Sequence, residues 1–247
     1  MCGVDAVSFD LDDTLAVTRR DRATLLREAC EAVGAPVLSR EAYLDAHADN
    51  LTAETRAATF AALLDERGVE GVDPAALAAA YRERVNDALV PVPGAAGLLA
   101  DLRERYRVGL LTNGSVRAQR AKVERLGWTD AFDAVVVTGD LPAGKPDPRA
   151  FAAACDALGA APERTVHVGD DPEADVGGAC GAGLRAVHVL GGDDRPDPRA
   201  VAHVRRAALA DDLPGILRAQ DRDEGSGRET ETGTGAETGT GTETDRG

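Results

Sequence analysis

Short apolar runs that are rich in β-branched residues alternate with helical patterns along most of the chain. Each run is apolar through its middle and ends in Gly, Asp or Asn, and helical patterns near 94–105, 115–126, 147–158 and 173–182 accompany the runs. This alternation is typical of right-handed βαβ units around a buried parallel sheet, whose ligands gather at the carboxyl ends of the strands. The pattern predicts a Rossmann-like α/β fold with strands within residues 4–13, 107–114, 133–140, 165–171 and 185–192.

About ninety residues between the first and second runs break this alternation, because their pattern is helical almost throughout. The segments LAVT (15–18) and VPVPG (90–94) mark the outgoing and returning crossings. We therefore expect an α/β core of residues 1–17 and 91–220, and an inserted helical cap of residues 18–90 that overhangs the strand ends as a lid. The helical patterns of the cap cover residues 19–34, 52–68 and 73–89.

The chain of 247 residues carries a net charge of −15, from 43 acidic and 28 basic residues. An acidic balance of this size argues against nucleic acid or an anionic membrane surface as a partner. Only two of the basic residues are lysines, Lys122 and Lys145, which favours adaptation to high salt, although a GC-rich genome would also favour arginine. Residues 221–247 repeat Gly, Thr and Glu without a large apolar residue, which predicts a disordered acidic tail.

The four cysteines lie far apart and include no C-x-x-C pair, so neither a zinc site nor a disulfide framework is indicated. No apolar run approaches the length of a membrane span, and the chain begins directly on a predicted strand. We therefore expect a cytoplasmic protein without a membrane partner. The pattern does not indicate an oligomeric state.

Three acidic residues, Asp10, Asp12 and Asp13, crowd together where the first predicted strand ends. Like charges at the end of an apolar element repel one another unless a metal ion or a proton joins them. Because side chains alternate along a strand, Asp10 and Asp12 are expected to share one side and one small volume. Paired carboxylates can bind a divalent cation, and one can act as a covalent nucleophile while the other moves a proton. The alternative is that these acids only cap the following turn.

The ends of the other predicted strands supply groups that suit a phosphoryl ligand. Thr112 and Asn113 offer a hydroxyl and a backbone N–H, and Ser115 can cap the helix that follows. Lys145 keeps a compact ammonium group in a chain that otherwise uses arginine, which suits contact with both a phosphoryl group and a carboxylate. The end of the fourth strand adds acids that either serve the site or cap a helix, namely Asp170, Asp171 and Asp175.

Taken in order, these strand-end residues resemble the signature motifs of the haloacid dehalogenase (HAD) superfamily: D-x-D-x-T, a strand-end Thr, a Lys and G-D-x-x-x-x-D. The resemblance covers residues 4 to about 192, and the helical insertion matches the position of the C1 cap of that family. It implies that Asp10 is the nucleophile and that Asp12 is the general acid and base. It also implies a Mg²⁺ ion held by the Asp10 carboxylate, the Asp12 backbone carbonyl and the Asp170 carboxylate.

The same resemblance implies that Thr112, the Asn113 amide and Lys145 bind the phosphoryl oxygens. Asp175 would orient Lys145 or a metal-bound water, with Asp171 in a supporting place. The implied activity is Mg²⁺-dependent hydrolysis of a small phosphorylated metabolite through an aspartyl-phosphate. The alternatives are a 2-haloacid dehalogenase, a phosphomutase, and a non-catalytic binding protein that uses the acidic tail. The presence of Asp12 favours phosphoester hydrolysis over dehalogenation.

Other conspicuous residues are expected to have ordinary structural roles. Arg19, Arg20 and Arg56 of the cap could meet the leaving group of a substrate, but exposed helix arginines are the commoner case. Trp128 is expected to pack against the end of its helix. The same expectation of a structural role applies to the scattered histidines, His47, His167, His188 and His203.

Overall fold

The computed structural model describes residues 3–48, 50, 52 and 54–222. Its centre is a six-stranded sheet in the order β5-β4-β1-β6-β7-β8, in which every pairing is parallel. The predicted α/β class is therefore confirmed, and each of the five predicted runs contains a strand. The strands are β1 (Ala6–Phe9), β4 (Arg107–Thr112), β5 (Ala134–Val137), β6 (Thr165–Gly169), β7 (Arg185–Leu190) and β8 (Ala202–Arg205).

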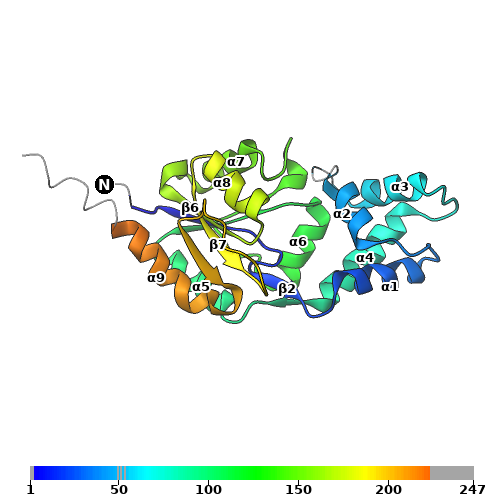
Figure 1. The fold of residues 1–247 in the computed structure, drawn as a ribbon, viewed down its shortest axis with the longest axis horizontal. Coiled ribbons are helices and arrows are strands. Elements are labelled where there is room, and N and C mark those ends of the chain that lie inside the picture. Colours follow the sequence, from blue (N-terminus) through cyan, green and yellow to red (C-terminus); the bar gives the residue numbers. More distant parts are fainter. Residues whose placement is uncertain (1–2, 49, 51, 53, 223–247) are drawn as a thin grey trace, which may run out of the picture.

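Helices cover both faces of the sheet (Figure 1). On one face, α5 (Ala95–Arg103), α6 (Val116–Arg125) and α9 (Leu209–Arg222) contribute to an apolar core with the central strands. On the other face, α7 (Pro148–Leu158) and α8 (Gly178–Gly181) enclose a smaller apolar cluster. Because helices bury both faces, the strands can be apolar throughout, which is why they are recognisable as continuous runs.

The inserted segment folds into helices that bury an apolar cluster of their own at the far end of the molecule from α9 (Figure 1). The side chains of Asp21 and Asp73 accept hydrogen bonds from backbone N–H groups in the first turns of two of these helices, so both starts are capped. The predicted helical patterns each contain a helix, and one further helix was not predicted. The cap helices are α1 (Arg22–Ala32), α2 (Arg40–Ala48), α3 (Ala57–Glu66) and α4 (Pro74–Ala88).

A short antiparallel ribbon joins the cap to the core. It pairs β2 (Ala16–Thr18) with β3 (Leu89–Pro91), the two segments where the chain crosses between the parts. The sequence marks both crossings but not their pairing. The exact domain boundaries, at residues 17 and 91, stay a prediction.

The last described helix anchors the start of the first strand. One carboxylate oxygen of Asp221 accepts a hydrogen bond from the backbone N of Val4 at 2.8 Å, and the other accepts one from the Tyr106 hydroxyl at 3.0 Å. This helix extends two residues into the segment predicted as a disordered tail, and residues 223–247 lie outside the described part of the chain. Among the residues that the structure describes, no helix combines the length and the apolar character that crossing a membrane would require.

Replacing Asp221 with alanine should lower the free energy of unfolding by about 1–2 kcal/mol, because two partly buried donors lose their acceptor. Urea unfolding of the full chain measures this change. The matched control is Asp212→Ala, which removes an exposed acid from the first turn of the same helix and should cost less than about 1 kcal/mol. Equal losses in the two variants would contradict an anchoring role for Asp221.

Candidate active site

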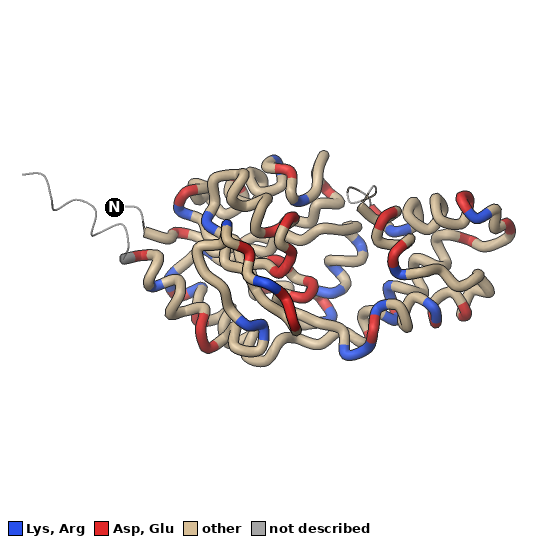
Figure 2. Tube along the Cα trace, viewed as in Figure 1, with Lys and Arg blue, Asp and Glu red and all other residues tan. Residues whose placement is uncertain are grey.

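The carboxyl ends of the central strands bring the predicted site residues together at the edge of the sheet that faces the cap. Strands β4, β1 and β6 are neighbours, so Thr112, Asp10 and Asp170, which end or follow them, meet in one place. Figure 2 shows acidic residues at this edge of the core and both basic and acidic residues on the facing side of the cap. The strands end at Phe9 and Gly169, so both acids lie on the loops just beyond the sheet.

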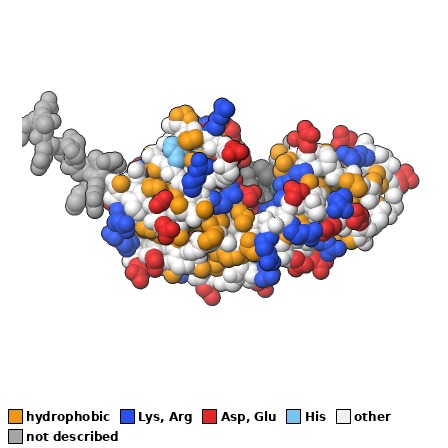
Figure 3. Space-filling model, turned by 60° about the horizontal axis from the view of Figure 1, so that its bottom comes forward, with side chains coloured by type: hydrophobic (Ala, Val, Ile, Leu, Met, Phe, Trp, Pro, Cys, Tyr) orange, Lys and Arg blue, Asp and Glu red, His pale blue; other side chains and the backbone are white. Residues whose placement is uncertain are grey.

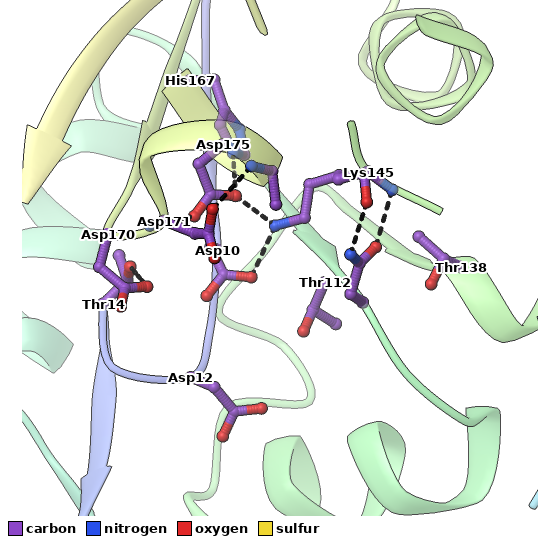
Figure 4. Close-up of polar contacts among 12 residues, drawn as sticks. Asp10, Asp12, Thr14, Thr112, Thr138, Lys145, His167, Asp170, Asp171 and Asp175 are labelled. Atoms are coloured by element: carbon purple, nitrogen blue, oxygen red, sulfur yellow. Dashed lines mark hydrogen bonds and ion pairs between the residues drawn. The ribbon is translucent and has the colours of Figure 1, made fainter. Parts of the chain in front are cut away.

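Lys145 lies at the centre of this group. Its Nζ donates to Asp10 Oδ1 at 2.7 Å and to Asp175 Oδ1 at 2.6 Å, and the residue is only 3 % exposed (Figure 4). Burial lowers the pKa of Lys145, but the charges of Asp10 and Asp175 outweigh burial and raise the pKa above its ordinary value. The side chain of Asn113 clamps the lysine backbone, since its amide donates to Lys145 O at 2.9 Å and accepts from Lys145 N at 2.8 Å.

Asp175 is a fully engaged carboxylate that holds the lysine in position. One oxygen accepts from Lys145 Nζ and lies 3.1 Å from His167 Nε2, and the other accepts from the backbone N of Asp171 at 3.0 Å. Burial raises the pKa of Asp175, but the opposing effects of Lys145 and His167 outweigh it and lower the pKa. This close packing requires a glycine in β6, because a Cβ on Gly169 would lie 2.3 Å from Asp175 Cγ.

Asp10 and Asp170 form the part of the site that could hold a metal ion. Carboxylate oxygens of Asp10, Asp170 and Asp175 lie within 4.8 Å of one another. Burial raises the pKa of Asp10 to about 7, against the opposing charge of Lys145, and burial together with Asp10 raises the pKa of Asp170 to about 9. Thr14 donates to Asp170 Oδ1 at 3.1 Å. Crowded hard oxygen ligands whose charged forms are disfavoured fit a dication such as Mg²⁺, which would relieve their repulsion.

Asp12 lines the same pocket as Asp10, as expected, but its carboxylate points another way and has its own partners. Its Oδ1 accepts from Arg22 Nη2 at 2.7 Å, and its Oδ2 accepts from Gln119 Nε2 at 3.1 Å and from Lys122 Nζ. Figure 4 shows its side chain pointing away from the Asp10 and Asp170 carboxylates. The two carboxylates point in different directions because β1 ends at Phe9, so the alternation of a strand does not extend to residue 12. The predicted contact of the Asp12 backbone carbonyl with Mg²⁺ stays a prediction.

The residues that surround Asp12 were not predicted. Burial raises the pKa of Asp12, but Lys122 and Arg22 hold it well below its usual range, so the carboxylate is ionised in this arrangement. Lys122 is only 1 % exposed on α6, and Arg22 reaches the core from α1 of the cap. One signal was available, because Lys122 is the second of the two lysines in an arginine-rich chain.

Three other predicted residues, Thr112, Asp171 and Ser115, differ in the hydrogen bonds that they form. The Thr112 hydroxyl accepts from Gln119 Nε2 at 2.7 Å, which leaves its own hydrogen available to a ligand. Asp171 accepts hydrogen bonds from two backbone N–H groups in a π-helical turn, Pro172–Gly177, and so caps that turn. Ser115 stands at the start of α6 but forms no capping hydrogen bond, so the predicted side-chain cap is wrong.

A pocket of about 400 Å³ lies between the strand ends and the cap. The surface is hollowed at this junction (Figure 3). Asp10, Lys145 and Thr112 line its floor, and α2 supplies His47 to its wall. His47 thus lines the pocket, whereas the buried His167 bonds with Ser8 and Asp175 as a core histidine would. A pocket of this volume suits a small metabolite.

The comparison with known families agrees with this geometry. Residues 4–183 match the model of the haloacid dehalogenase-like hydrolases. The chain belongs to this family. The resemblance inferred from the motifs is thereby confirmed, and the HAD-like match includes the whole inserted cap as well as the four motifs.

Relatives and solved structures add detail to the family. A phosphoserine phosphatase of Thermus thermophilus is 40% identical over 165 residues, which are 64% of this chain and 66% of that protein, so the match spans slightly less than two thirds of that relative. A glyceraldehyde 3-phosphate phosphatase of Methanothermobacter thermautotrophicus is 33% identical over 196 residues, covering 74% of this chain and 84% of that protein. The fold matches a HAD hydrolase of Bacillus subtilis bound to magnesium, with a TM-score of 0.68, 24% identity and coverage of 87% and 99%.

Replacing Lys122 with methionine should lower the free energy of unfolding of this HAD hydrolase by about 1–3 kcal/mol at pH 7. The physical reason is that Asp12 loses a buried cationic partner while the apolar stem keeps its volume. The control is Arg120→Met on the same helix, which breaks only the exposed pair with Asp140 and should cost less than about 1 kcal/mol. Denaturant unfolding measures both, and a smaller loss for Lys122→Met than for the control would contradict the pairing.

Proposed function

We propose that the protein hydrolyses phosphomonoesters of a small metabolite with the help of Mg²⁺, through an aspartyl-phosphate on Asp10. The observation that carries the proposal is the buried Asp10 carboxylate, which is hydrogen-bonded to Lys145 and adjoins Asp170 at the floor of a cap-covered pocket. Relatives named as phosphatases of phosphoserine and of glyceraldehyde 3-phosphate support the same reaction.

The proposed reaction has two displacements. First, a carboxylate oxygen of Asp10 attacks the phosphorus, the bond from phosphorus to the alcohol oxygen breaks, and that oxygen takes a proton from Asp12. Second, water attacks the phosphorus of the aspartyl-phosphate and gives its proton to Asp12. Inorganic phosphate leaves, the Asp10 carboxylate returns, and Asp12 is again protonated.

The other site residues bind and orient the phosphoryl group in this proposal. Lys145, the Thr112 hydroxyl and the Asn113 backbone N–H meet the phosphoryl oxygens, while Asp175 positions the lysine. Asp10, Asp170 and the Asp12 carbonyl would hold Mg²⁺, which when bound supplies positive charge to the transferring group. Lys145 and the cation are needed because the net charge of −15 repels an anionic substrate at longer range.

Asp12 needs a different charge state in each displacement. Its ionised form, held by Lys122 and Arg22, suits the role of base in the second step. A phosphoryl group bound beside it raises its pKa by repulsion and favours the protonated form that the first step requires. Since Arg22 belongs to α1, opening of the cap would also remove one cation from Asp12.

The other candidate functions share the fold but have less support. Dehalogenases and phosphomutases occur among the structural neighbours, as a 2-haloacid dehalogenase of Pseudomonas syringae and a beta-phosphoglucomutase of Thermotoga maritima. The curated relatives described above are both named phosphatases. A binding role for the acidic tail lies outside the described residues. We further propose that the protein works at high salt, as its acidic, lysine-poor composition suggests, and that it is located in the cytoplasm.

Replacing Asp10 with asparagine should lower phosphate release to less than about one-hundredth, because the nucleophile loses its charge while its volume stays. Phosphate release is measured over a panel of small phosphomonoesters with Mg²⁺, in dilute buffer and in molar KCl. The control variant Asp140→Asn, an exposed acid of the core, should keep full activity. Retention of about a tenth of the rate by Asp10→Asn would rule out this nucleophile. Halide release from 2-chloropropionate without metal would favour the dehalogenase.

Magnesium should raise the melting temperature of the wild-type protein. At a magnesium concentration of a hundred times the dissociation constant, binding adds about 2.7 kcal/mol to the free energy of unfolding. Asp170→Asn should lose most of this rise. Without metal it should be more stable than the wild type, because it removes a carboxyl group whose charged form burial and Asp10 disfavour in the folded protein. Thermal unfolding with Mg²⁺ and with a chelator measures both effects. The neighbouring control Asp171→Asn keeps its capping ability and should respond to Mg²⁺ like the wild type. A full response in Asp170→Asn would contradict its role as a ligand.

A further inference from the structure

The pocket is charged oppositely on its two sides. The core lines it with carboxylates and Lys145, whereas among the described residues the cap lines it with cations, aromatic rings and no acid. We call the cap side the roof and define it by Arg40, Tyr43, Arg56 and Tyr81. The transferring phosphoryl group belongs at the floor, beside Asp10. The roof therefore faces the part of the substrate that leaves as an alcohol.

Arg56 is a buried cation to which the described residues supply no hydrogen-bond acceptor. It is 7 % exposed at the start of α3, and its Nε and Nη1 have no hydrogen-bond partner within the described residues. Its guanidinium carbon lies 5.5 Å from the centre of the Tyr81 ring, a cation–π contact that makes no use of the N–H donors. Buried donors without acceptors are rare in folded proteins because each one costs free energy, so an unfilled set calls for a ligand.

Two tyrosine hydroxyls in the roof are in the same condition. Tyr43 and Tyr81 are each 1 % exposed, and neither hydroxyl has a partner in the part of the chain that the structure describes. The centroids of the two rings lie 5.2 Å apart in an edge-to-face contact, which fixes both side chains. Arg40 adds a second guanidinium 5.2 Å from the Tyr43 ring, and no described carboxylate forms an ion pair with it.

The surroundings of His47 are consistent with the positive character of this region. The ring stacks on Tyr43 with centroids 5.5 Å apart. Burial, followed by the charges of Arg56 and Lys122, lowers its pKa to about 3. A neutral histidine between cations leaves the positive charge of the roof uncompensated, which favours an anion there.

We propose that the roof binds a second anionic group, a carboxylate or a phosphate, on the alcohol part of the substrate, through Arg56 and the hydroxyls of Tyr43 and Tyr81. The inference rests on the proposed phosphomonoester hydrolysis and narrows its substrate class. The substrate is a phosphorylated metabolite whose leaving group is itself an anion. Anionic oxygens are the acceptors that a guanidinium and two phenol hydroxyls can meet together.

Three substrates that differ at one end test the proposal. Ethyl phosphate has no second anion, 2-phosphoglycolate has a carboxylate, and propane-1,3-diol bisphosphate has a second phosphate. The wild-type protein with Mg²⁺ should show a kcat/KM at least about tenfold higher for one of the two substrates with a second anionic group than for ethyl phosphate. The preferred substrate identifies that group. Equal values for all three substrates would overturn the proposal.

Variants of the roof then assign the preference to its residues. Arg56→Gln should lower the ratio of kcat/KM for the preferred substrate to kcat/KM for ethyl phosphate by about ten- to a hundredfold. Arg56→Lys should restore part of this ratio. Tyr81→Phe, which keeps the ring and removes one donor, should lower the ratio less. The control is Arg27→Gln on the outer surface of α1, where Arg27 pairs only with Glu31. An equal loss for every substrate would show that Arg56 only supports the cap, and would overturn the proposal.

A binding measurement separates this inference from the proposed function. Calorimetry compares phosphonoacetate with ethylphosphonate, two probes that are not hydrolysed and differ in the carboxylate, and propane-1,3-bisphosphonate covers the second phosphate. If no substrate releases phosphate, the proposed function fails. The inference about the roof still stands or falls on whether Arg56→Gln weakens only the probes with a second anion. Binding of all three probes that is equally strong in wild type and Arg56→Gln would overturn it.

Discussion

A buried ammonium group between two carboxylates is the interaction on which the site depends. Lys145 comes from the loop after β5, Asp10 follows β1, and Asp175 lies beyond β6, so one cation ties three segments of the core together. Removing one partner would leave an uncompensated buried charge, which typically costs about 3–5 kcal/mol. The surrounding contacts, from the Asn113 clamp to the absence of a side chain on Gly169, keep the three groups at hydrogen-bonding distance.

The same interaction divides the acidic residues by role. Both carboxylate oxygens of Asp175 are occupied by Lys145, His167 and a backbone N–H, so this residue holds the lysine in place. One carboxylate oxygen of Asp10 accepts a hydrogen bond from Lys145, and one carboxylate oxygen of Asp170 accepts a hydrogen bond from Thr14. The acids with uncommitted oxygens are the ones whose pKa values burial and repulsion raise. We therefore expect reactivity and metal affinity where the charge is least well compensated.

Sequence patterns predicted the parts of this arrangement that depend on local order. Runs of β-branched residues located the central strands, and the scarcity of lysine singled out Lys145. The edge strand β8, AHVR, has no apolar run to reveal it, and α2 has a polar, alanine-rich sequence. The partners of Asp12 come from α1 and α6, far away in the sequence, so only the packing of cap on core brings them together. Strand alternation did not predict the direction of the Asp12 side chain because the strand had already ended.

The antiparallel ribbon of β2 and β3 has a consequence for how far the cap can vary without changing the core. Both passages of the chain between core and cap are hydrogen-bonded to each other, and the cap helices bury a cluster separate from that of the sheet. The ribbon therefore holds the two ends of the insertion together, so helices of other lengths and sequences can replace the cap without disturbing the strands of the core. A change in the cap can therefore alter what the pocket accepts while the groups at the strand ends stay in place.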